Sequence, residues 1–162
     1  MEPDANKQLI RRWIAMANAH FVGEFEEFIA SDFVGHLSGS PDQDFAELKR
    51  LELGFAAAFP DTQYTIEDLI AEGDRVVLRV TTRGTNLGEF LGRPATRRRV
   101  TFTGIVIYRI ENNRICESWA EIDFGGLLRQ LAALAAGDTH GDTQTAGSVE
   151  QPPSGNAPKS LQ

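Results

Sequence analysis

The stretch GTNLGEFLGRPATRRRVTFTGIVIYRIENNRICESWAEIDFGGLLRQL, residues 84–131, decides the fold. It opens with a glycine-rich loop that contains a proline and continues into an apolar, β-branched run at 100–110. Asn112 and Asn113 follow this run, and asparagine tolerates the positive φ that a two-residue hairpin turn requires. A return strand is therefore expected at 115–123, and the amphipathic segment 127–136 is expected to form a short helix.

Upstream of this hairpin, apolar residues recur at helical spacing. Leu9 and Trp13 share one apolar stripe, which predicts an amphipathic helix at 5–21 with Trp13 directed inward. A second short helix is expected at 24–30. It is followed by a short extended segment, 32–37, that ends in a loop.

A third helix is predicted between Ser40 and Pro60. Ser40 can cap this helix, Pro41 suits its first position, and Gln43 completes a capping box. The helix ends before Pro60, because the residue before a proline is disfavoured in helical conformation. Its apolar residues fall on one face: Phe45, Leu48, Leu51, Phe55 and Phe59.

Two further strands are expected at 63–71 and 75–85, joined by a tight turn. Helices that precede a run of consecutive strands indicate an α+β fold rather than a doubly wound parallel sheet. With 162 residues the chain suits one domain, at 1–136. Residues 137–162 contain almost no large apolar side chains, so a disordered tail is expected there.

Composition narrows the classes of partner. The formal charge of −7 argues against nucleic-acid binding, which needs clustered Lys and Arg. Cys116 is the single cysteine, so an internal disulfide is excluded and a reducing compartment is expected. The sequence shows no signal peptide and no apolar run of membrane-spanning length, which favours a cytoplasmic protein. Its histidines, His20, His36 and His140, are too scattered to form a recognisable metal motif.

Polar side chains gather on the return strand, which makes it the expected wall of any functional pocket. Its polar and aromatic residues are Glu117, Ser118, Trp119, Glu121 and Asp123. His36, at the end of the first extended segment, can act as acid or base near neutral pH. The alternative for His36 is a loop-edge histidine whose nitrogens are satisfied by backbone or water.

The run LGEFLGRPATRRRVTFTGIVIYRIENNRICESW, followed by DFGGLLRQL, resembles the SnoaL-like polyketide cyclase family, which includes members labelled ester cyclases. The upstream FPDTQYTIEDLIAEGDRVVLRVTTRGT, NKQLIRRW and SDFVGHL agree with this resemblance, which covers roughly residues 5–134. It implies the nuclear transport factor 2-like fold. In that fold a curved antiparallel sheet, three N-terminal helices and a short C-terminal helix form a cone around one pocket. The resemblance also implies a homodimer that pairs through the sheets.

Cyclases of this family close a ring by aldol condensation without cofactor or metal, using a base and donors that stabilise an enolate. The resemblance places their acid/base aspartate at Ala120, their pocket histidine at Val106 and an asparagine at Gly35. An alanine cannot transfer a proton. The candidate pocket-lining residues are Trp13, Val106, Ser118 and Ala120, and the alternative for Trp13 is a core residue.

Asp123, His36 and Glu121 are then the candidate catalytic residues. Because side chains alternate along a strand, Glu121 and Asp123 are expected to face away from Ala120 unless a bulge rotates one inward. Asp123 alternatively caps the last helix, and Glu121 alternatively lies exposed or on a dimer face. If Asp123 turned inward beside His36, each would shift the pKa of the other.

Two classes of function follow. The first is a cofactor-independent cyclase, isomerase or hydrolase that acts on a small apolar carbonyl or ester compound. One variant is epoxide hydrolysis by two carboxylates with Arg79 or Arg83. The second is a non-catalytic domain that binds a small apolar molecule or supports a dimer, which Ala120 and Val106 favour. A carboxylate within the apolar pocket would favour catalysis, and a wholly apolar lining would favour binding.

Overall fold

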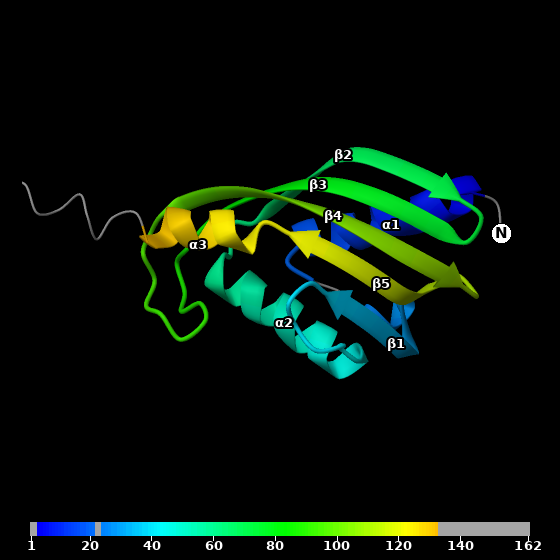
Figure 1. The fold of residues 1–162 in the computed structure, drawn as a ribbon, viewed down its shortest axis with the longest axis horizontal. Helices are drawn as coiled ribbons and strands as arrows, with labels where there is room; N and C mark the ends of the chain where they lie inside the picture. Colours follow the sequence, from blue (N-terminus) through cyan, green and yellow to red (C-terminus); the bar gives the residue numbers. More distant parts are fainter. Residues whose placement is uncertain (1–2, 22–23, 133–162) are drawn as a thin grey trace, which may run out of the picture.

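The computed structural model describes residues 3–21 and 24–132, in which one five-stranded sheet is covered by helices (Figure 1). The elements in chain order are α1 (Pro3–Asn18), the 3₁₀ turn η1 (Phe25–Glu27), β1 (Ile29–Leu37), α2 (Phe45–Ala58), β2 (Gln63–Glu72), β3 (Arg75–Thr85), β4 (Arg99–Glu111), β5 (Arg114–Ile122) and α3 (Phe124–Ala132). This is the α+β architecture that the sequence predicts. The expected tail, 137–162, and the end of the expected last helix lie outside the described residues.

The strands lie in the order β1-β5-β4-β3-β2. β2, β3, β4 and β5 form an antiparallel meander, whereas β1 is parallel to β5. The prediction of an antiparallel sheet is therefore wrong for β1. The reason is topological, because β1 pairs with the last strand of the meander rather than with a neighbour joined to it by a hairpin. Among the described residues no helix is long and apolar enough to cross a membrane.

The predicted hairpin at the centre of the sheet is confirmed. Glu111 pairs with Arg114, and Asn112 and Asn113 between them have φ of 51° and 59°. Positive φ at both central residues is the type I′ geometry that matches the twist of the flanking strands. Because β1 pairs with β5 and β3 with β4, both strands of this hairpin lie inside the sheet.

The first two predicted helices differ from the structure. α1 ends at Asn18, and His20 and Phe21 have φ of 58° and 57°, which a helix cannot accommodate. The helix expected at 24–30 is only the 3₁₀ turn η1, and β1 begins at Ile29. Tertiary pairing decides this region, because the Ile115 N–H donates to the Phe28 carbonyl oxygen and Ile29 pairs with Ile115.

The start of the third predicted helix also shifts. α2 begins at Phe45, and its cap is Asp44, whose Oδ1 accepts from the Glu47 N–H at 2.8 Å. Ser40, Pro41 and Gln43 are not its cap. Gln43 instead exchanges two backbone hydrogen bonds of 2.8 Å with Gly35 of β1, which keeps it extended.

Asp123 caps α3, as one of the two alternatives predicted. Its Oδ1 accepts from the Gly126 N–H at 2.7 Å, and a side chain at Gly126 would collide with the Asp123 carboxylate. α3 therefore begins at Phe124 rather than at the predicted Leu127. The sequence DFGG thus opens the helix, with the glycines inside its first turn.

Alternation along the strands separates two faces of the sheet. On the inner face, buried Val76, Leu78, Val106, Tyr108 and Ile110 pack in one cluster with Leu9 and Trp13 of α1. A second cluster joins Ala58 and Phe59 at the end of α2 to Val100, Phe102 and Leu127. Burial of these side chains, at about 25 cal/mol per Å² of apolar surface, drives the layers together.

We predict that Asp123→Ala destabilises the protein by about 1 kcal/mol, because the N-terminal N–H groups of α3 lose their carboxylate acceptor. Urea unfolding followed by far-UV circular dichroism measures this change. Asp123→Asn is the matched control, since an amide oxygen caps nearly as well as a carboxylate. A stability of Asp123→Ala equal to that of wild type would contradict the capping role.

Candidate functional site

A cavity of about 1010 Å³ lies between α2 and the inner face of the sheet. Its wall is mainly apolar and aromatic. The lining includes Trp13, Phe33, Leu48, Phe55, Phe90, Phe102, Val106, Ile115, Ala120 and Ile122. This size is typical of a site for a small organic molecule. Of the predicted lining residues, Trp13, Val106, Ser118 and Ala120 all lie in this wall.

Glu52 brings a carboxyl group into this apolar wall from α2. Leu48, Glu52 and Phe55 follow one another at intervals of four and three residues, so they share one face of the helix. Phe59 continues that face and is fully buried. Glu52 therefore stands in the middle of the apolar stripe that α2 directs at the sheet.

The surroundings of Glu52 change its acidity. Its side chain is half-buried and lines the cavity. Burial disfavours the charged form and raises the pKa of Glu52 to about 7. A carboxyl group with this pKa can accept or release a proton at neutral pH.

Two tyrosines share the cavity with Glu52. Tyr64 comes from β2 and Tyr108 from β4, and both line the wall. Burial is the main cause that raises the pKa of each phenol, and the negative charge of Glu52 is the next. The Trp13 side chain opposes this rise in the pKa of Tyr108. The polar part of the cavity is thus a carboxyl group with two phenols.

His36 also lines this cavity. Its imidazole stacks on Trp119 of β5, with ring centroids 5.5 Å apart. Nδ1 lies 2.8 Å from Asp42 Oδ1, and Nε2 lies 3.1 Å from Glu117 Oε1. Hydrogen bonds to Asp42 and then to Glu117 raise the pKa of His36, because both partners favour the imidazolium form.

The other two predicted catalytic residues lie away from the cavity wall. Asp123 is exposed and engaged as the cap of α3. Glu121 pairs with Ile105 of the outer face and accepts a hydrogen bond from the Ser38 hydroxyl. The hypothesis of an Asp123–His36 pair fails, because their side chains have different partners. Ala120 faces the cavity and pairs with Val106.

The arginines of the epoxide-hydrolase variant also lie elsewhere. Arg79 is on the exposed side of β3, where its Nε donates to Asp68 Oδ2 at 2.6 Å. Arg83 is exposed on the same side of that strand. Neither arginine lines the cavity that contains Glu52.

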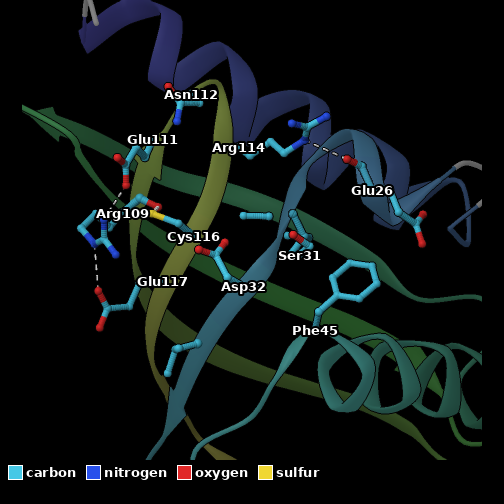
Figure 2. Close-up of a pocket in the computed structure, with 13 residues that line it drawn as sticks. Glu26, Ser31, Asp32, Phe45, Arg109, Glu111, Asn112, Arg114, Cys116 and Glu117 are labelled. Carbon is cyan, nitrogen blue, oxygen red and sulfur yellow. Dashed lines mark hydrogen bonds and ion pairs between the residues drawn. The ribbon is translucent and has the colours of Figure 1, made fainter.

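A second hollow, of about 630 Å³, lies between β1 and the β4–β5 hairpin (Figure 2). Both of its arginines are paired with neighbours. Arg109 donates to Glu117 at 2.8 Å and to Glu111 at 3.3 Å, and Arg114 donates to the Glu26 carbonyl oxygen at 3.0 Å. These groups stabilise the junction of β1 with the hairpin. We therefore take the larger, apolar cavity as the candidate site.

Within residues 3–21 and 24–132, no three His, Cys, Asp or Glu side chains converge as metal ligands would.

The sequence model of the SnoaL-like polyketide cyclases matches residues 7–131. The chain belongs to the SnoaL-like polyketide cyclase family. No curated protein matches the chain.

Solved structures agree with this SnoaL-like assignment. AclR from Streptomyces galilaeus, a candidate hydroxylase, is 28% identical with a TM-score of 0.75 and covers 82% of this chain and 98% of its own. TsrD from Streptomyces laurentii is 27% identical with a TM-score of 0.73, and the match covers 82% of this chain and 98% of TsrD. IdmH from Streptomyces antibioticus, a candidate polyketide cyclase, is 30% identical with a TM-score of 0.69, and the match covers 78% of this chain and 97% of IdmH. The similar structures thus carry names of more than one activity.

Sequence reasoning missed Glu52, Tyr64 and Tyr108. A signal for Glu52 is present, because an acidic residue interrupts an apolar stripe at the spacing of Leu48 and Phe55. Tyr108 likewise follows Val106 at the strand period of two, within the run predicted to be apolar. Neither signal shows which side chains meet, since Glu52 belongs to a helix and the tyrosines to separate strands.

We predict that Glu52→Gln stabilises the protein at pH 8 and that this gain disappears at pH 4. The folded state binds the Glu52 proton more tightly than the unfolded state, so wild-type stability falls as pH rises from the unfolded pKa of about 4.5 to about 7. The full effect is on the order of 3 kcal/mol, from about 1.4 kcal/mol per pKa unit. Urea unfolding of both proteins from pH 4 to pH 8 measures the difference.

Glu67→Gln is the matched control for this experiment, because Glu67 is an exposed residue of β2 outside the cavity lining. Its substitution is expected to change stability equally at both pH values. A stability difference between wild type and Glu52→Gln that does not vary with pH would show that Glu52 titrates normally.

Proposed function

We propose that this chain is a cofactor-independent enzyme that uses Glu52 as acid/base on a small apolar carbonyl or ester compound. The observation that carries this proposal is the Glu52 carboxyl group in the wall of a large, mainly aromatic cavity. Membership of the SnoaL-like family supports it, as do the structural similarities to AclR and IdmH. An apolar cavity with a few convergent polar groups is the usual form of a small-molecule site.

The proposed chemistry is an internal proton transfer. The Glu52 carboxylate removes a proton from the carbon next to a carbonyl group, and the electron pair of that C–H bond forms an enolate. In a cyclisation the enolate carbon attacks a second carbonyl carbon of the same molecule. Protonated Glu52 then returns its proton to the new alkoxide oxygen, so the reaction is balanced without an oxidant or reductant. Efficient proton transfer is favoured when the pKa of the base lies near the working pH.

This proposal moves the acid/base role from the last strand to α2. The position implied for the family aspartate is Ala120, whose methyl group lies in the same cavity wall as Glu52. Asp123 and Glu121 receive no proton-transfer role, because they cap α3 and bond Ser38 respectively. His36 is assigned a structural role in the cavity wall, where it links β1 to Asp42.

A binding protein without catalysis is the second candidate function. The apolar pair Val106 and Ala120 in the cavity wall favours it, since these positions carry no proton donor or acceptor. Such a protein would hold the same small apolar molecule and release it unchanged. The two candidates differ in one observable, the exchange of a substrate proton with solvent.

We predict that Glu52→Gln lowers kcat/KM for α-proton exchange about 10²- to 10⁴-fold, since it removes the general base. The assay follows loss of the α-proton signal of 1-tetralone, an apolar ketone, by NMR in D₂O. For wild type, kcat/KM should rise with pH through about 7, where Glu52 ionises. Styrene oxide hydrolysis tests the epoxide variant in parallel.

Glu67→Gln is again the control and should keep wild-type activity. Binding of 1-tetralone without exchange by the wild-type protein would favour the binding function. Exchange that survives in Glu52→Gln at the wild-type rate would place the base elsewhere.

We further propose a cytoplasmic homodimer that pairs through the outer face of the sheet. Four apolar side chains lie in register across four strands of this face: Ile70, Val77, Ile107 and Trp119. Ile70 is 64% exposed, and the neighbouring Ile105 is 48% exposed. Val77, Ile107 and Trp119 are half-buried, and a contiguous, partly exposed apolar row is typical of a protein interface. The single cysteine, Cys116, suits a reducing compartment.

The double variant Ile70→Asp, Ile105→Asp should be a monomer with an intact fold, because both side chains are exposed in one copy of the chain. Size-exclusion chromatography with light scattering measures the mass, and circular dichroism checks the fold. Leu53→Asp, at a 43%-exposed position of α2, is the control and should remain dimeric. A monomeric wild-type protein would refute the proposed dimer.

A further inference from the structure

The loop between β3 and β4, residues 86–98, reaches the cavity from the side on which α2 lies (Figure 1). Its base is fixed by Asn86, which is buried. The Asn86 Oδ1 accepts hydrogen bonds from the N–H and the hydroxyl group of Thr96 at 2.8 and 3.0 Å, and its Nδ2 donates to the Gly88 carbonyl oxygen at 2.8 Å. The Gly88 N–H donates in turn to the carbonyl oxygen of Ala58, the last residue of α2, at 3.0 Å. The loop is therefore held both by its own hydrogen bonds and by α2.

Phe90 attaches the tip of this loop to the wall of the cavity. Its ring packs edge-on against Phe55 and Phe59, with ring centroids 5.8 and 5.2 Å apart. Phe90 and Arg93 exchange two backbone hydrogen bonds of 3.0 Å, which close a two-residue turn. Leu91 is the first residue of that turn, and it lines the cavity. The tip of the loop thus has a fixed position at the candidate site.

Leu91 has a backbone conformation that disfavours its side chain. Its φ is 51° and that of Gly92 is 72°, which is the type I′ geometry of a two-residue turn. The turn between β4 and β5 has the same geometry, and there the residue with φ of 51° is an asparagine, Asn112. A leucine in the left-handed region costs free energy that asparagine or glycine largely avoids. Stability of the turn therefore does not explain a leucine at this position.

Packing within the chain does not explain Leu91 either. Its side chain is 67% exposed, which is the largest value for a large apolar residue in the described part of the chain. Leu51 of α2 is also exposed, and it lines the same cavity. The cavity therefore has an apolar border that is open to solvent, next to Glu52 along α2. A strained residue without packing partners at a cavity points to a role toward a ligand.

We propose that Leu91 is a specificity-determining residue, which packs against a hydrocarbon group of the bound substrate at the open border of the cavity. This inference rests on the proposed function and narrows its substrate class. The substrate is a carbonyl compound whose reacting carbon lies at Glu52 while a hydrocarbon group remote from that carbon reaches Leu91 and Leu51. A cavity of about 1010 Å³ has room for such an extended molecule. Binding removes two apolar surfaces from water, those of the leucines and of the hydrocarbon group, and this favours the complex.

Two ketones that differ in one hydrocarbon group test this inference by binding, without turnover. Acetophenone has a carbonyl group on one aromatic ring, and 4-butylacetophenone adds a butyl chain at the opposite end of that ring. Quenching of tryptophan fluorescence measures both affinities, because Trp13 lines the cavity. The quantity compared between variants is the ratio of the two affinities, and wild type should bind 4-butylacetophenone more tightly. Thermal unfolding of the same proteins gives Tm.

Leu91→Asn should lower this affinity ratio about fivefold, since the butyl group loses its apolar contact. The same variant should raise Tm by about 2 °C, because asparagine tolerates the positive φ of the turn. Opposite signs for binding and stability distinguish a ligand contact from a structural role. Leu91→Met should keep the ratio within about twofold of wild type, because methionine also presents an apolar side chain. Leu53→Asn, at an exposed position of α2 outside the cavity lining, is the matched control and should leave the ratio unchanged.

An affinity ratio in Leu91→Asn equal to that of wild type would overturn the inference, whatever the Tm of the variant. A lower Tm for Leu91→Asn would mean that the leucine serves the fold, which would overturn it as well. Equal affinities of wild type for the two ketones would exclude the proposed hydrocarbon group. Proton exchange by Glu52 is measured separately, so the proposed base and the proposed specificity residue can fail independently.

Discussion

The parallel pairing of β1 with β5 is the constraint on which the candidate site depends. Val34 to Leu37 pair with Glu117 to Ala120 and add β1 to the edge of the meander. The next segment then folds back, and Gln43 bonds Gly35 of the same strand. A side chain at Gly35 would press on the Phe33 ring, so glycine permits this close approach. α2 consequently starts beside the sheet edge and runs across the cavity that contains Tyr108.

Burial of a carboxyl group couples stability to the proposed chemistry. The apolar wall that forms around Glu52 through packing of Phe55 and its neighbours also withholds water from the carboxylate. The same desolvation that raises the Glu52 pKa to about 7 lowers the stability of the folded protein at higher pH. A destabilising buried carboxylate is tolerated at a functional site because the surrounding core supplies the compensating free energy.

The family assignment and the candidate base come from different parts of the chain. The resemblance depends mainly on β3, β4, β5 and the start of α3, and it is confirmed by the match at residues 7–131. The implied acid position is Ala120, in the strand that the resemblance covers best. Glu52 faces the same cavity from α2. One cavity can thus receive its carboxyl group from the helix instead of the strand, because both elements border it.

The sequence by itself determined the α+β class and the β2–β3 and β4–β5 hairpins, and it offered the cap at Asp123 as one of two alternatives. These features depend on residues close together in the chain, such as Asn112 and Asn113, whose backbone preferences act locally. Tertiary structure alone decided that β1 is parallel to β5, that Gln43 is extended rather than helical, and that Glu52 lines one cavity with Tyr64 and Tyr108. Each of these depends on contacts between distant segments. Local periodicity can show that Glu52 or Tyr108 lies on the apolar face of its helix or strand. It contains no information about which other helix or strand that face will contact.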